Sequence, residues 1–215
     1  MPGQAPSVVL RAYRADTEHR EVRRERAGDQ VLDGADADVC RGAAGDVPCC
    51  AAAARPVGGR LVIVGHGVVE RQVHGPLAAT GGAESLVLKE RRYRCRACKA
   101  ILTVGPRGLV RRRWYGAGAI ALAFDGYARG ETGASIRRRV SPSATVGGSA
   151  RERWVTLVRW IDTAGGGRLF GVSALGDLPR RRVAELVVLA LAGRAGRALG
   201  DDLAEAAFAG AAIAA

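Results

Sequence analysis

Two cysteines separated by two residues, Cys95 and Cys98, constrain the fold of this chain more than any other feature. They lie between residues 85–93 and 100–104, which carry the apolar and β-branched side chains of short strands. A hairpin turn with cysteines at this spacing directs both thiolates at one ion about 2.3 Å away, as in a zinc knuckle. The pattern therefore predicts a small β module that binds a structural zinc ion.

A tetrahedral zinc site needs two more ligands, and the sequence offers an incomplete second pair. The usual knuckle has the pattern C-P-x-C, whereas this chain has Val47-Pro48-Cys49-Cys50, with valine in the first position. Adjacent cysteines chelate one ion poorly, so Cys49 is a weaker substitute. We predict zinc at Cys50, Cys95 and Cys98, with Cys49 as the candidate fourth ligand.

Other interpretations of the cysteines stay open. Cys40 and His66 are more distant candidate ligands. Alternatively, the cysteines are small buried thiols that hold no metal.

The formal net charge is +12, which favours a polyanionic partner. Nearly all of the positive charge is arginine, and a GC-rich genome also produces that bias, so the position of the charge matters more than its total. From Lys89 to Arg113 there are ten Lys and Arg residues and one acidic residue, Glu90. Residues 1–46 carry seven Arg against nine Asp and Glu, and they show no periodic apolar face.

Three helices are predicted after the β module. Apolar residues recur at helical spacing over 115–129, and Thr132 can cap a second helix over 133–140 that buries Ile136 and Val140. Ser149 and Glu152 form a capping box for a third helix. The predicted core stripe of that third helix is Trp154, Leu157, Val158 and Ile161, with Trp160 on its flank.

The third helix is predicted to enter the DNA major groove, where Arg pairs with guanine and Thr contacts the thymine methyl. The link over 141–148 is longer than the usual helix-turn-helix turn of about three or four residues. A solvated arginine-rich face without a partner is the alternative. The residues expected on DNA are Arg111, Arg112, Arg113, Arg137, Arg138, Arg151, Arg153, Thr156 and Arg159.

We expect an α+β protein in four parts. These are a flexible leader over 1–46, a zinc-ribbon-like β module over 47–110, a helix-turn-helix-like segment over 111–164, and Gly/Ala-rich C-terminal helices over 165–215. The last part contains a helix over 179–199 and another from Asp201, which either form a homodimer or close the core. No signal peptide or membrane span is recognisable, so the expected location is cytoplasmic and nucleoid-associated.

The order of these motifs resembles short bacterial proteins related to insertion-sequence transposases. The resemblance covers about residues 47–164, from PCC through RPVGGRLVIVGHG and RRYRCRACKAILTVGPRG to the three helices. In that family an N-terminal zinc ribbon precedes a helix-turn-helix that binds the ends of the element. The resemblance implies zinc at Cys50, Cys95 and Cys98 and double-stranded DNA on the third helix.

We expect no catalytic site, because a transposase needs a carboxylate triad that holds two metal ions. The acidic residues after position 164 lie on or beside simple helices and read as solvated faces and caps. They are Asp177, Glu185, Asp201, Asp202 and Glu205. The alternatives are a divergent transposase, a non-specific RNA- or protein-binding ribbon, and a decayed reading frame.

Overall fold

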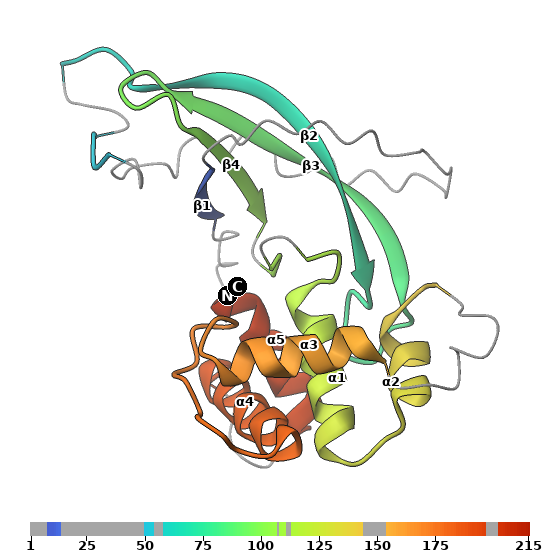
Figure 1. Cartoon of the computed structure of the whole chain (residues 1–215). Coiled ribbons are helices and arrows are strands. Elements are labelled where there is room, and N and C mark those ends of the chain that lie inside the picture. The colour runs from blue at the N-terminus through green and yellow to red at the C-terminus, as the bar shows by residue number, and fades with distance from the viewer. Residues whose placement is uncertain are drawn as a thin grey trace. The chain divides into compact units, whose positions relative to one another are not determined.

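The computed structural model describes residues 8–13, 50–53, 58–106, 108–110, 113–143, 154–196 and 202–215. The chain divides into two compact units. Met1–Gln72 and Leu86–Arg107 form the β unit, and Val73–Ser85 and Gly108–Ala215 form the helical unit (Figure 1). The fold is therefore of the predicted α+β class.

The β unit is built on a sheet with the strand order β1-β4-β3-β2. Its strands are β1 (Val8–Tyr13), β2 (Ile63–Gly75), β3 (Glu84–Cys95) and β4 (Ile101–Pro106). β4 pairs antiparallel with both β1 and β3, and Tyr93 of β3 is opposite Leu102 of β4. The long strands β2 and β3 run side by side, and their connected ends over 73–85 belong to the helical unit (Figure 1).

Two predictions about the strands were wrong. The apolar and β-branched residues of 60–64 and 67–73 predict two separate strands on either side of Gly65-His66. In the structure, residues 63–75 instead form one strand, and Gly67 adopts a φ of 92° within it. Residues 8–13 were expected in a flexible leader, but they pair with β4, from Val8 opposite Pro106 to Tyr13 opposite Ile101. A local pattern cannot reveal a partner so far along the chain. The rest of the predicted leader lies outside the described residues.

The helical unit contains α1 (Ala117–Ala128), α2 (Gly133–Val140), α3 (Val155–Gly165), α4 (Arg180–Arg194) and α5 (Leu203–Ala214). The predicted cap of α2 is confirmed, because the Thr132 hydroxyl accepts the N–H of Ser135 at 3.2 Å. Asp202 caps α5 by accepting the N–H of Ala204 at 2.9 Å. The capping box of Ser149 and Glu152 lies outside the described residues, and α3 begins at Val155.

The helices of the two parts predicted over 111–164 and 165–215 share one core. In this core, α1 packs against α4 and α5 (Figure 1). Small residues permit this close approach. A Cβ on Gly210 of α5 would overlap the carbonyl oxygen of Leu191, and a Cβ on Gly118 of α1 would overlap the ring of Phe208.

The prediction that Trp160 lies on the flank of α3 was wrong. Its side chain is 1% exposed, because the rings of Tyr115 and Trp154 pack against it.

Candidate functional site

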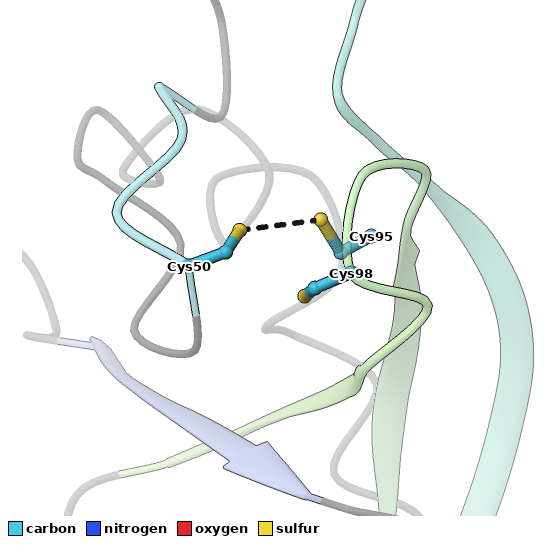
Figure 2. Close-up of side chains that lie close together, drawn as sticks. All are labelled: Cys50, Cys95 and Cys98. Carbon is cyan, nitrogen blue, oxygen red and sulfur yellow. Dashed lines mark hydrogen bonds between the residues drawn. The ribbon is translucent and has the colours of Figure 1, made fainter.

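Three cysteine sulfurs converge in the β unit. Cys95 ends β3 and Cys98 follows in the turn before β4, while Cys50 comes from a separate loop (Figure 2). All three Sγ atoms lie within 4.8 Å of one another, and those of Cys50 and Cys95 are 3.8 Å apart. Tetrahedral zinc with bonds of about 2.3 Å places its sulfurs about 3.8 Å apart, whereas a disulfide bond is about 2.0 Å long. The spacing therefore fits a metal site.

The turn that carries Cys95 and Cys98 is held by backbone hydrogen bonds. The N–H of Cys95 donates to the carbonyl of Ala100 at 2.9 Å, and the N–H of Lys99 donates to the carbonyl of Cys95 at 3.0 Å. The N–H of Arg96 donates to the carbonyl of Val62 at 2.7 Å. Cys95 is fully buried in a small core with Leu102 and Ile63. Burial and these hydrogen bonds therefore fix the position of the candidate ligand Cys95.

Backbone N–H groups also favour the thiolate at Cys95. Burial raises the pKa of this thiol, but hydrogen bonds from the N–H groups of Cys98 and Ala97 and from the neighbouring thiols lower it. The net pKa of Cys95 lies below its ordinary value. A metal ion binds the thiolate, so this environment suits a metal ligand.

Cys50 and Cys98 share a local backbone feature. The residues that follow Cys50 and Cys98 both adopt left-handed backbone, with a φ of 53° at Ala51 and 63° at Lys99. The N–H of Ala52 donates to the Cys50 sulfur and lowers its pKa, but burial and the thiols of Cys98 and Cys95 outweigh this and raise it. A cation between the three sulfurs would offset the repulsion between thiolates.

Among the described residues, no fourth ligand joins the three cysteines. Val47 and Cys49 lie outside them, and His66 is exposed and does not belong to the group. Within the ranges that the structure describes, the three cysteines are the only group of three or more His, Cys, Asp or Glu residues placed to hold one ion.

A run of basic residues leads along β3 into the cysteine cluster. We call it the basic strand, and it consists of Lys89, Arg91, Arg92, Arg94, Arg96 and Lys99. All of these side chains are exposed except Arg92, which is half-buried. The one acidic residue in this run, Glu90, is buried and its carboxylate lies 3.3 Å from the Arg71 guanidinium. It therefore contributes little negative charge to the surface.

Many arginines of the helical unit form hydrogen bonds or ion pairs with other residues of the same unit. Arg180 binds both carboxylate oxygens of Asp162, at 2.7 and 3.1 Å. Arg181 donates to the carbonyl of Ala128 at 2.8 Å, at the end of α1. Further bonds of this kind are made by Arg129, Arg139, Arg182 and Arg194. Much of the positive charge of this unit is therefore structural.

The residues predicted to bind DNA are spread over the helical unit. Arg113 is half-buried and donates to the Thr163 hydroxyl at 3.4 Å, while Arg138 and Arg159 are exposed. Arg137 of α2 and Thr156 of α3 are half-buried. Four of the predicted residues lie outside the described ranges, namely Arg111, Arg112, Arg151 and Arg153.

A helix-turn-helix packs its two helices on each other. Among the described residues, the main contacts of α2 are with α1, and those of α3 are with α4 and α1.

The sequence analysis counted the residues of the basic strand as local positive charge, but it did not predict them as a binding site. Their exposure around an inward-facing Glu90 is visible only in the structure.

Comparisons with protein-family models, with curated proteins and with solved structures found no match for this chain. In the described part of the chain, no helix combines the length and the apolar character that a membrane crossing requires.

Proposed function

We propose that this chain is a DNA-binding protein whose β unit is a zinc ribbon that presents the basic strand to the phosphate backbone. One observation carries the proposal. Five exposed cations follow one another along β3 and its turn, and the single acidic residue among them is buried against Arg71. Each phosphate contact by such a cation releases counterions, which drives binding to duplex DNA.

In this proposal the zinc ion is structural. Cys50, Cys95 and Cys98 would hold it, and Cys49 is the candidate for the fourth position. The ion would supply a cross-link between the loop of Cys50 and the β3–β4 turn. Because the basic strand ends at this turn, the cross-link would hold Arg94, Arg96 and Lys99 in place.

Base contacts are proposed for α3, which presents Arg159 to solvent and half-exposes Thr156. We further propose that the protein binds DNA without cleaving it, as an accessory protein related to insertion-sequence transposases. The motif order over residues 47–164 supports that relation.

Fluorescence anisotropy with a labelled duplex tests the proposal. We expect Arg94→Gln/Arg96→Gln to weaken binding roughly tenfold at low salt and to reduce the slope of log affinity against log salt by about 2. The control Arg168→Gln/Arg182→Gln removes the same charge from exposed residues of the helical unit and should leave affinity nearly unchanged. Arg159→Gln tests the contribution of α3 separately. Wild-type protein that fails to bind duplex DNA at low salt would overturn the proposal.

A further inference from the structure

An aromatic cluster in the helical unit extends from the core to the surface. Trp154 and Trp160 are buried with ring centroids 5.3 Å apart, and Tyr115 packs edge-on against Trp160 at 4.9 Å. Tyr115 also packs edge-on against His74 at 5.5 Å, and His74 lies 5.9 Å from Trp114. Trp114 ends the series and is 61% exposed, more than any other large apolar side chain in the described part.

The exposed tryptophan stands on a rigid support. The backbone N–H of His74 donates to the carbonyl of Trp114 at 2.5 Å, and the N–H of Gly116 donates to the carbonyl of His74 at 3.0 Å. The His74 ring is fixed by a hydrogen bond of 2.9 Å between its Nδ1 and the Ser85 hydroxyl. A tryptophan ring held open to water on a fixed backbone is preorganised for a ligand, and tryptophan is enriched among binding hot spots.

The charge next to Trp114 indicates the kind of partner. Three consecutive arginines, Arg111 to Arg113, precede it in the sequence. The Arg113 guanidinium is placed by its hydrogen bond to Thr163. Burial lowers the pKa of His74, which favours the neutral ring beside Trp114. An uncharged aromatic face next to the described Arg113 suits a nucleobase, which stacks on the ring while its phosphate contacts a guanidinium group.

We propose that Trp114 is a stacking platform for an unpaired base of single-stranded nucleic acid. This inference rests on the proposed function, and it adds a second binding surface with a different ligand. Bases paired within a duplex cannot offer a face to an indole ring. The platform should therefore act on single strands or on melted ends, whereas the basic strand acts on duplex phosphates.

Fluorescence anisotropy tests the stacking platform. The full chain is titrated against labelled thymidine and uridine oligonucleotides of about 15 nucleotides and against a duplex. Trp114→Ala should weaken binding of the single strands about 5- to 100-fold and leave duplex affinity within about twofold. Trp114→Phe keeps an aromatic face and should retain most of the affinity. Leu178→Ala, at another exposed apolar residue, should change neither the single-strand affinity nor the duplex affinity. The oligonucleotide that binds more tightly identifies the strand as DNA or RNA.

Tryptophan fluorescence supplies a second measurement. Because Trp154 and Trp160 are buried, stacking should quench only Trp114, and Trp114→Phe should abolish the quenching. Unchanged single-strand affinity in Trp114→Ala, with duplex binding intact, overturns the platform and leaves the proposed function standing. If the wild-type chain binds neither single strands nor duplex, both proposals fail.

Discussion

The sulfur atoms of Cys50 and Cys95 lie 3.8 Å apart, although 44 residues separate the two cysteines in the sequence. This is the separation that a tetrahedral thiolate site requires, and it is far too long for a disulfide. A shared ion would cross-link two segments that lie far apart in the sequence. The stability of the β unit and its metal content should therefore change together.

The first prediction concerns metal content. Purified protein should carry close to one zinc ion per chain, and Cys95→Ser should release it, because Cys95 is the buried ligand. Elemental analysis after gel filtration measures the ratio. His66→Ala should keep the zinc, because His66 lies outside the cysteine group. Wild-type protein that is folded but free of metal would refute the zinc site.

The second prediction restores the missing ligand. Val47 occupies the position where a knuckle has its first cysteine, so Val47→Cys should raise zinc affinity by tenfold or more. Loss of one group that supports a metal ligand typically lowers metal affinity about 10- to 100-fold, and an added ligand should have at least an effect of this size. Competition with a chromophoric chelator measures the change. Val47→Ser serves as the control for size and polarity and should have no such effect. Equal affinities of Val47→Cys and wild type would show that another residue already fills the fourth position.

The third prediction concerns the contact between α4 and α5. Gly210→Ala should lower the free energy of unfolding by about 1–3 kcal/mol, because its Cβ would overlap the carbonyl oxygen of Leu191. Gly193→Ala on α4 is the matched control, since nothing beyond the backbone of its own helix lies within 4 Å of the added Cβ. Gly193→Ala should raise the free energy of unfolding above that of wild type by about 0.5–1 kcal/mol, because alanine has a higher helix propensity than glycine. Urea denaturation followed by circular dichroism compares the two variants, and similar free energies of unfolding would contradict the close packing of α4 and α5.

The fourth prediction concerns pH. Burial raises the pKa of Asp125, although Arg129 and Arg139 oppose the shift. The folded state then holds this proton more tightly than the unfolded state, so the contribution of Asp125 to stability is lost as pH rises through its folded pKa. Asp125→Asn should therefore gain stability relative to wild type as pH rises above the unfolded pKa of an aspartate, about 4.

Urea denaturation at several pH values measures this difference for Asp125→Asn. Asp177→Asn at an exposed carboxylate provides the comparison. A difference between Asp125→Asn and wild type that stays constant with pH would contradict the assignment.

Several elements were predictable from the sequence because their signals are local. The helix over 133–140 was predicted with its Thr132 cap and its buried Ile136 and Val140, and all of these are confirmed. A cap depends on a hydroxyl near the first N–H groups, and a buried face depends on spacing along one helix. The turn with Cys95 and Cys98 between two strands was predictable for the same reason.

The sequence by itself determined the residue types that can bind a metal or a phosphate and the short segments that carry them. Only the tertiary structure decided that β1 pairs with β4, that Trp160 is buried, and that Cys50 meets Cys95. It also decided that Glu90 faces Arg71 and leaves the neighbouring cations on the surface. These outcomes depend on contacts between residues far apart in the chain. The free energy of such contacts is set by packing and burial across the whole unit, which no local pattern contains.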